Sequence, residues 1–345
     1  MLTFETQGPP FERGRQQAFA CEAVAHRWAE RVRARVRESL DAERVREEVA
    51  LMCREMAEIY PEGYEECRGI AAGLGLEESD YFTAAGSLRL FRRLANCTVV
   101  GFRTLGGRPV IGKTDDILWE ELGSNVLEVT RPDRGYRHAH FHFAGSIWSV
   151  AGMNERGLAM GMNGIAGPTL ERPGLASLEA LHTILPACAT VAEAVTHIRR
   201  LPLSHGGFSL TLGDAEGGLA VVERTAAGMA VLPSGPDGCF AHTNHILDPS
   251  FAARNPPQKE PVGTNGRRRL CTALARLSRV PRSEEGMRSL LGDASPAGAI
   301  FQTGEDGFHT DFAVIFAPVE KRLTCWDGHP ERSEPRRLLM AELFA

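Results

Sequence analysis

The sequence predicts an α+β protein in which a helical head, residues 1–96, precedes a β-rich body, residues 97–345. Apolar residues recur at helical spacing through most of the head, whereas short β-rich runs separated by turn residues begin at Cys97. The strands come mostly as hairpins, without a regular strand–helix–strand alternation. This pattern favours antiparallel sheets over a doubly wound parallel sheet.

The head is expected to consist of helices. Apolar residues such as Trp28 and Val32 are spaced as on one face of a helix, and Pro61 marks the end of a helix. The expected helices cover residues 12–39, 42–59, 62–73 and about 78–92.

The body is expected to open with a hairpin whose strands, 97–103 and 109–112, flank Gly106-Gly107. The Pro- and Arg-containing segment 249–269 is expected to be a long surface loop. Further strands are expected near 125–130, 136–143, 147–151, 157–163, 207–213, 218–225, 311–317 and 321–326, and helices over 176–187, 190–200, 265–279 and 284–292.

Composition narrows the class of protein. The 345 residues carry 39 Lys and Arg against 44 Asp and Glu, and this net charge of −5 disfavours a nucleic-acid binder. No apolar run approaches the roughly 18 residues that span a bilayer, so no membrane partner is expected. The N-terminus lacks a signal pattern and the eight cysteines form no CxxC pair, so we expect a cytoplasmic protein with reduced thiols.

Cys97 lies where the head meets the body, at the start of a predicted strand. Taken alone, it reads as one more buried thiol, since free cysteine is a common core residue. Its position suggests a second interpretation, because a chain break before it would expose an α-amino group beside its own thiol. Such an amine, with a pKa of roughly 7.7–8.0, can serve as the general base for that thiol.

Asp115 and Asp116 end the second strand of the hairpin, which should bring them near Cys97. A carboxylate there can hold or orient the amine, although adjacent Asp residues also often form turns or caps. Asn163 and Asn244 are neutral donors of the kind that stabilise a tetrahedral oxyanion. The alternative for each asparagine is a turn or strand-end role.

Seven segments, taken in order, resemble the motifs of one known family. They are GPPFERGRQQA (8–18), YPEGYEECRGIAAGLGL (60–76), NCTVVGF (96–102), GKTDD (112–116), GMNERGLAMGMNGI (152–165), SLTLGDAEGGLAVVE (209–223) and HTNHILDP (242–249). Together they resemble the penicillin acyltransferase family (acyl-coenzyme A:6-aminopenicillanic-acid acyltransferase and its bacterial relatives), which are cysteine N-terminal-nucleophile hydrolases. The resemblance implies a four-layer αββα sandwich of antiparallel sheets.

The resemblance also implies roles for single residues. Cys97 would be both the self-cleaving residue and the nucleophile, with the cut between Asn96 and Cys97 and the head kept bound as a small subunit. Asp116 would orient the new amine, Asn244 would be the main oxyanion donor, and Asn163 would be a second polar contact at the reacting carbonyl. No cofactor or metal would be required.

Four positions depart from the pattern of the family. Asn96 stands where relatives often carry Gly, Lys113 where they often carry Arg or Gln, and Thr114 where Asn is frequent. The segment before the penultimate strand offers His309 where some relatives use Arg. These departures bear on how fast the chain would cleave itself and on which substrate it would accept. The candidate substrate-binding residues are Lys113, Asp115, His245 and His309.

Two further groups of residues have competing interpretations. His138, His140 and His142 alternate along one strand and share a face, a spacing that metal ligands use, but a solvated or site-lining strand face is the simpler interpretation. The run Arg267-Arg268-Arg269 suits the phosphate of an acyl-coenzyme A donor, and is otherwise a solvated helix start.

The sequence therefore predicts an amidohydrolase or acyltransferase that cleaves a linear amide of a small acylated amine through an acyl-enzyme. An acyl-coenzyme A is a candidate donor. Two alternatives stay open: an unprocessed, non-catalytic relative that binds a small molecule, and a metal-dependent hydrolase that uses His138, His140 and His142.

Overall fold

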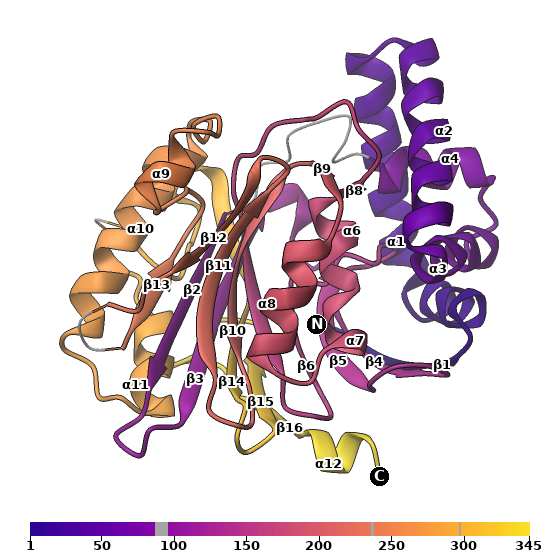
Figure 1. The fold of residues 1–345 in the computed structure, drawn as a ribbon. Coiled ribbons are helices and arrows are strands. Elements are labelled where there is room, and N and C mark those ends of the chain that lie inside the picture. Colours follow the sequence, from indigo (N-terminus) through magenta and orange to yellow (C-terminus); the bar gives the residue numbers. More distant parts are fainter. Residues whose placement is uncertain (87–95, 236–237, 297) are drawn as a thin grey trace.

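The computed structural model describes residues 1–86, 96–235, 238–296 and 298–345. Two β-sheets pack face to face, and helices cover the outer face of each sheet (Figure 1). Between the sheets, the Phe141 ring of the larger sheet stacks on the Phe312 ring of the smaller sheet at 4.5 Å. The predicted α+β class, a four-layer αββα sandwich, is confirmed.

The larger sheet has eight strands among the described residues, and its neighbours run antiparallel except for the parallel pair β1 and β4. In spatial order they are β1 (Leu2–Gly8), β4 (Asn125–Pro132), β5 (His138–Phe143), β6 (Ala151–Asn154), β7 (Ala159–Gly164), β10 (Gly207–Gly213), β11 (Leu219–Thr225) and β12 (Gly228–Leu232). The short strands β8 (Leu175–Ala176) and β9 (Leu203–His205) form a separate parallel pair.

The smaller sheet has six antiparallel strands in the same described ranges. In spatial order they are β13 (Phe240–His242), β2 (Asn96–Arg103), β3 (Pro109–Leu118), β14 (Phe308–Ala317), β15 (Arg322–Trp326) and β16 (Arg336–Leu339). The predicted hairpin is β2 and β3, and Gly107 takes the positive φ of 79° that its turn requires.

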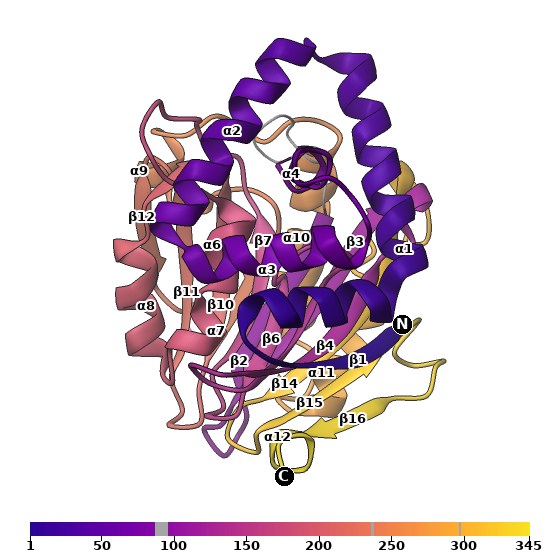
Figure 2. The same cartoon turned by 90° about the vertical axis from the view of Figure 1, so that its right-hand side faces the viewer.

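Four helices of the head lie beside the larger sheet, as Figure 2 shows face on. They are α1 (Pro10–Ser39), α2 (Ala42–Ile59), α3 (Pro61–Gly73) and α4 (Glu78–Ala85). The helix predicted at 78–92 therefore ends earlier, and its residues 87–92 lie outside the described residues. The helical prediction was wrong for residues 2–8, which form β1 and pair with β4 of the body. The division into a separate head and body stays a prediction.

Two glycines let α1 and α3 cross closely. A Cβ on Gly14 would lie 2.0 Å from the carbonyl oxygen of Glu66, and a Cβ on Gly69 would lie 2.0 Å from that of Phe11. No residue other than glycine fits such an approach. The crossing fixes Glu66 beside Arg13, with Arg13 Nη2 2.5 Å from Glu66 Oε2.

The remaining helices cover the two sheets. The larger sheet is covered by α6 (Ser177–His182), α7 (Ile184–Ala187) and α8 (Val191–Arg200). The smaller sheet is covered by α10 (Val262–Leu277) and α11 (Glu284–Leu291). The short elements are α9 (Pro249–Ala252), α12 (Met340–Leu343) and the 3₁₀ turns Trp119–Glu121 and Glu305–Gly307. The predicted loop at 249–269 was wrong, because α9 and the first turns of α10 occupy it.

The strand predicted at 147–151 was also wrong. Residues 147–150 form no strand, and β6 begins at Ala151. Trp148 instead packs edge-on against Trp28 of α1, with ring centroids 5.6 Å apart. No described helix is long and apolar enough to cross a membrane, and the cytoplasmic location stays a prediction.

Candidate active site

The hairpin of β2 and β3 places Cys97 beside Asp115. Its register pairs Asn96 with Asp116 and Cys97 with Asp115. Facing residues on antiparallel strands project their side chains to the same side of the sheet. Cys97, Asp115 and Lys113 therefore share one face, whereas Asn96 and Asp116 share the other.

On the first face, a buried carboxylate is held between the thiol and an ammonium group. Cys97 Sγ lies 3.3 Å from Asp115 Oδ1, and Lys113 Nζ lies 2.8 Å from the same oxygen. Lys113 also donates to the carbonyl oxygen of Met162 at 2.9 Å, and Asn125 donates to Asp115 Oδ2 at 3.2 Å. These contacts fix the Asp115 carboxylate against the thiol.

Burial dominates the electrostatics of this face. The pKa of the Cys97 thiol is raised to about 12, first by burial and then by Asp115, while Lys113 acts in the opposite direction. Burial lowers the pKa of Lys113, but Asp115 and Cys97 outweigh it, so the pKa is raised. In the uncleaved chain the thiol is thus protonated at neutral pH, and forming the thiolate requires a nearby base.

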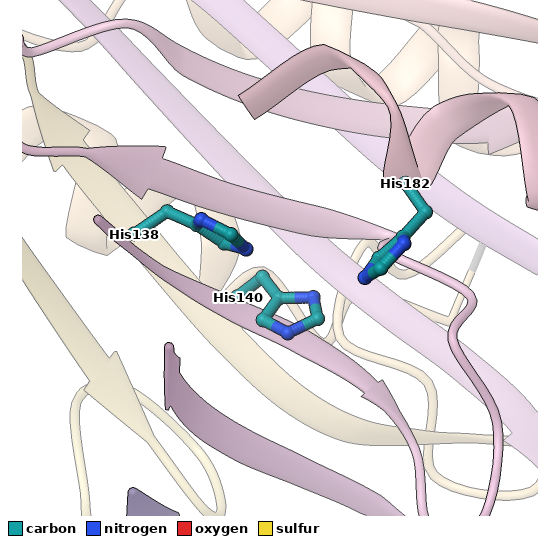
Figure 3. Close-up of side chains that lie close together, drawn as sticks. All are labelled: His138, His140 and His182. Carbon is teal, nitrogen blue, oxygen red and sulfur yellow. The ribbon is translucent and has the colours of Figure 1, made fainter. Parts of the chain in front are cut away.

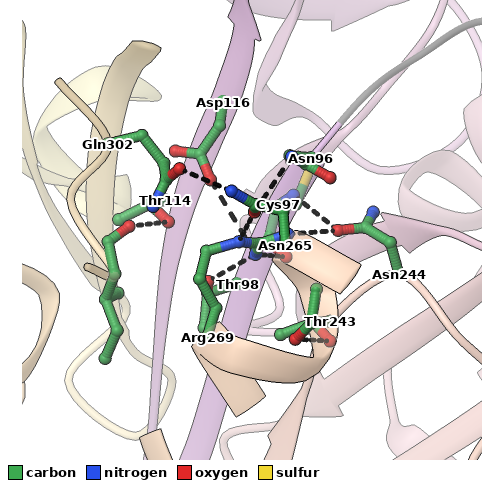
Figure 4. A network of polar contacts seen from close by, with 12 residues as sticks. Asn96, Cys97, Thr98, Thr114, Asp116, Thr243, Asn244, Asn265, Arg269 and Gln302 are labelled. Atoms are coloured by element: carbon green, nitrogen blue, oxygen red, sulfur yellow. Dashed lines mark hydrogen bonds and ion pairs between the residues drawn. The ribbon is translucent and has the colours of Figure 1, made fainter. Parts of the chain in front are cut away.

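Arg269 of α10 ties the start of β2 to the segment after β13 (Figure 4). Its guanidinium donates to the Cys97 carbonyl oxygen at 2.5 Å, to Asn244 Oδ1 at 2.8 Å and to Asn265 Oδ1 at 2.6 Å. The side chain is fully buried. The rigid fork of guanidinium donors holds the backbone of Cys97 and the amide of Asn244 in one arrangement.

Asn244 is oriented from both ends of its amide. Its Oδ1 accepts from the backbone N–H of Cys97 at 3.0 Å as well as from Arg269, and its Nδ2 donates to the carbonyl oxygen of Gly164 at 3.1 Å. The structure therefore places Asn244 next to Cys97, and the sequence predicts that these two residues belong to one site.

Asp116 lies on the face away from the thiol. Thr310 donates to its Oδ1 at 2.6 Å, and Arg269 Nη1 lies 3.9 Å from its Oδ2. Burial raises the pKa of Asp116 to about 6, although Arg269 opposes the shift. The register gives the contact with the Cys97 side chain to Asp115, and the expected role of Asp116 in orienting the Cys97 amine stays a prediction.

The other predicted site residues lie on neighbouring elements. Asn163 Nδ2 is 3.4 Å from His242 Nδ1, and its Oδ1 is buried without a hydrogen-bond partner in the described chain. His245 is half-buried, and burial, followed by the charge of His242, lowers the pKa of His245 to about 4. His309 packs on Trp119, with ring centroids 5.0 Å apart. Substrate-binding roles for His245 and His309 stay predictions.

Arg269 and Asn265 also contact the site, although the sequence did not single them out as site residues. A solvated helix start was expected for the run 267–269, which is wrong for Arg269, since only the first two arginines of the run are exposed. Asn265, Arg269 and Ala273 follow one another at intervals of four residues and share the buried face of α10. Extending this spacing back through the predicted loop would have identified Arg269 as a buried side chain.

The three histidines of β5 are buried, so the expected solvated strand face is wrong. Phe141 points into the sandwich, where it packs against the other sheet, and the histidines on either side of it therefore point to the opposite, helix-covered face. That face does not line the Cys97 site. Among the described residues, the groups whose ligand atoms lie close together are His138, His140 and His182, and Glu128, His140 and His142.

Comparisons with solved structures show likeness in fold. Penicillin V acylase from Agrobacterium tumefaciens aligns with a TM-score of 0.50 and 16% identity, over 71% of this chain and 87% of the acylase. Conjugated bile acid hydrolase from Clostridium perfringens aligns with a TM-score of 0.49 and 12% identity, over 72% and 93% of the chains. The Caenorhabditis elegans ortholog of N-acylethanolamine-hydrolyzing acid amidase aligns at 0.46 and 15%, over 65% and 93%.

A comparison of the sequence with models of protein families identifies the family of this chain. No curated protein matches the chain, but the family model of acyl-coenzyme A:6-aminopenicillanic acid acyl-transferase matches residues 103–332, about two thirds of its length. The match begins six residues after Cys97 and includes Asp115, Asn163, Asn244 and Arg269. The chain therefore belongs to the acyl-coenzyme A:6-aminopenicillanic acid acyl-transferase family.

Proposed function

We propose that this protein cleaves itself between Asn96 and Cys97 and then uses Cys97 to hydrolyse the amide bond of a small acylated amine. The observation that carries the proposal is the position of Cys97, whose backbone nitrogen lies 3.0 Å from Asn244 Oδ1 and whose thiol lies 3.3 Å from Asp115. Cleavage would leave an amine at this nitrogen, next to the thiol and basic near neutral pH.

Self-cleavage begins with attack of Cys97 Sγ on the carbonyl carbon of Asn96. The S–C bond forms as the peptide C–N bond breaks, Asp115 takes the thiol proton, and the departing nitrogen gains that proton as the amine of Cys97. Water then hydrolyses the thioester, which leaves a carboxylate on Asn96 and a free thiol on Cys97. The contact of Arg269 with the Cys97 carbonyl oxygen supports this step, because it holds the backbone in place.

In each turnover, the Cys97 amine takes the thiol proton and the thiolate attacks the substrate carbonyl. The charge of Lys113 beside Asp115 and the thiol favours the thiolate. We assign the oxyanion to the amide groups of Asn244 and Asn163, and one such donor lowers the barrier by about 3–4 kcal/mol. The ammonium passes its proton to the leaving amine, and water hydrolyses the acyl-enzyme.

The family and the name of the aligned acylase support the proposed substrate class. Both indicate an acyl group on the nitrogen of a small molecule. We propose hydrolysis as the principal reaction, with transfer from an acyl-coenzyme A as the variant that an added acceptor amine would reveal. Arg267 and Arg268, both exposed at the start of α10, are candidates for contact with a coenzyme A phosphate.

The test combines mass and turnover in one preparation. Purified protein is expected to contain two chains, residues 1–96 and 97–345, that elute together in gel filtration, and to release nitroaniline from a panel of acyl 4-nitroanilides. An acyl-enzyme trapped by rapid acid quench should carry the acyl mass on the chain that begins at Cys97. The Cys97→Ala variant should remain one chain of 37.6 kDa and release no amine.

Two outcomes would replace the proposal with an alternative. A single chain that matches the Cys97→Ala variant in mass and releases no amine would indicate a non-catalytic relative that binds a small molecule. Turnover that persists in Cys97→Ala and is lost on addition of a chelator would indicate a metal-dependent hydrolase.

A further inference from the structure

A second polar cluster lies between the larger sheet and the helical head, on the face of β5 that points away from Cys97. His138 and His140 come from β5, and His182 comes from the last turn of α6 (Figure 3). All three side chains are buried, and one ring nitrogen of each lies within 4.8 Å of the others.

One nitrogen of each ring already has a partner in the chain. Nδ1 of His138 lies 2.9 Å from the Tyr136 carbonyl oxygen, Nδ1 of His140 lies 2.6 Å from Ser149 Oγ, and Nδ1 of His182 lies 2.8 Å from the Tyr60 hydroxyl. These contacts orient the three rings from behind. Metal-binding histidines are commonly oriented in this way, through a hydrogen bond to the nitrogen that does not bind the metal.

For His138 the opposite nitrogen supplies a lone pair rather than a donor. A carbonyl oxygen only accepts, so His138 carries its proton on Nδ1 and presents an unprotonated Nε2. Nε2 of His138 and Nε2 of His140 are both buried and have no hydrogen-bond partner among the described residues. Because buried polar atoms are almost always paired, this arrangement points to a ligand that accepts electron pairs.

Two carboxylates stand next to the three rings. Glu66 Oε1 lies 3.9 Å from His182 Nε2, and Glu128 Oε2 lies 3.8 Å from His140 Nε2. Glu128 is already engaged, since it accepts from Thr6 and from Gln17 and faces His142 at 3.0 Å. Glu66 pairs with Arg13 through Oε2, but its Oε1 is turned toward His182, so we take Glu66 as the fourth ligand.

We propose that His138, His140 and His182, with Glu66 as the fourth ligand, bind one zinc ion at the interface between the head and the larger sheet. Three imidazoles and one carboxylate are a ligand set that zinc uses in a tetrahedral site. Zinc–ligand bonds of about 2.0–2.1 Å place the ligand atoms about 3.4 Å apart, so the side chains move inward by roughly an ångström on binding. The site is closed by protein and is therefore structural.

The site would join parts of the chain on either side of the Asn96–Cys97 bond. Glu66 belongs to α3 of the head, whereas the three histidines belong to the body. If cleavage occurs, as proposed above, the ion holds the small fragment on the large one. Zinc binding itself does not depend on cleavage, so the two proposals fail independently.

The test measures metal directly in the full chain, in the wild type and in the uncleavable Cys97→Ala variant. After treatment with a chelator and dialysis, both proteins are titrated with Zn²⁺, and bound zinc is measured by mass spectrometry. Both are expected to bind one ion per chain, and Co²⁺ in its place should give the visible absorption of a tetrahedral site with nitrogen and oxygen ligands. His182→Gln is expected to weaken zinc binding by about 100-fold or more.

A matched control is His142→Gln, which changes a buried histidine of the same strand whose Nε2 faces Glu128. It should keep its zinc. Should His182→Gln fail to fold, Tyr60→Phe removes only the hydroxyl that contacts His182 Nδ1, and should weaken binding by about 10–100-fold. The proposal is overturned if the wild type binds no zinc at micromolar concentration, or if His142→Gln loses the ion while His182→Gln keeps it.

Discussion

The polar residues around Cys97 and those around His140 are buried to the same degree, but their hydrogen bonds are completed in different ways. Around Cys97 most polar groups pair within the chain, as Lys113 does with Asp115 and Arg269 with Asn244. The unpaired buried atoms there include the side-chain oxygens of Asn96 and Asn163. Around His140 each Nδ1 has a partner in the chain, whereas the Nε2 atoms of His138 and His140 have none among the described residues.

Buried polar groups can therefore serve two different purposes in this protein. A network whose donors and acceptors satisfy one another can hold an atom of the chain itself in a reactive position, as we propose for the sulfur of Cys97. A set of converging lone pairs lacks a donor and is completed by a cation. Burial is similar in both clusters. What distinguishes them is that the unpaired atoms around His140 are ring nitrogens that lie close together, whereas those around Cys97 are side-chain oxygens.

The largest expected effect is the loss of turnover in Cys97→Ala, a single substitution that should leave the cluster around His140 unchanged. Cys97→Ala removes the nucleophile and should lower the release of amine from an acylated substrate by about 10⁴-fold or more, while bound zinc stays at one ion per chain. Amine release and zinc content are measured on the same preparation. Cys271→Ala, which changes an exposed cysteine of α10, should keep wild-type turnover. Turnover in Cys97→Ala would contradict the assignment of the nucleophile.

A comparison of the two adjacent aspartates tests the register of the Cys97 network. Asp115→Asn removes the carboxylate that contacts the thiol, and should slow self-cleavage by about 10²–10³-fold, the size of effect of a general base. Asp116→Asn should slow it by less than about tenfold, because Asp116 lies on the other face. The rates are measured by following the appearance of the two chains after translation in vitro. The reverse order of effects would return the orienting role to Asp116.

Removal of a buried charge should reduce folding stability. In the single-chain Cys97→Ala protein, Arg269→Met should lower the free energy of unfolding in urea by about 3–5 kcal/mol, since it leaves Asp116 without its buried partner. Arg269→Lys should recover part of the loss because it keeps the charge. Arg268→Met, at the exposed neighbouring position, should change the free energy by less than about 0.5 kcal/mol. Equal effects at both positions would show that the Arg269 contacts do not stabilise the fold.

The dependence of stability on pH reports the environment of Asp116. Burial raises the pKa of this group to about 6 in the folded protein from 3.8. The folded state therefore binds the proton more tightly than the unfolded state, and the resulting stabilisation is complete below pH 3.8 and is lost as the pH rises through 6. Relative to Asp116→Asn, also in the Cys97→Ala background, the parent should lose about 2.4 kcal/mol of unfolding free energy between pH 4 and pH 7.

Urea titrations of both proteins at each pH check this result. Parallel profiles for the parent and the Asn variant would show that Asp116 titrates in its usual range.

Much of the fold can be predicted from local sequence. The helical spacing around Trp28 and the turn at Gly106-Gly107 depend on neighbouring residues only, and both are found in the structure. The edge strand β1 was missed because it directly precedes a long helix, and its pairing partner β4 lies more than 100 residues further along the chain.

The candidate site could be predicted where it follows from a hairpin or a motif, and not where it depends on tertiary contacts. The pairing of Cys97 with the Asp115–Asp116 end of β3 follows from the hairpin, but which aspartate shares the face of the thiol requires the register. Arg269 reaches Cys97 from 172 residues away. The histidines of β5 are buried by the head, through contacts such as Gln17 with Glu128, which no local pattern reveals.

The proposed break in front of Cys97 can be detected directly from the intact mass of the freshly purified protein. Two masses are expected in the wild type, those of residues 1–96 and of a chain that begins at Cys97, and one mass of 37.6 kDa is expected in Cys97→Ala. A wild-type protein that stays at 37.6 kDa under the same conditions, or that is cut at another bond, would contradict it.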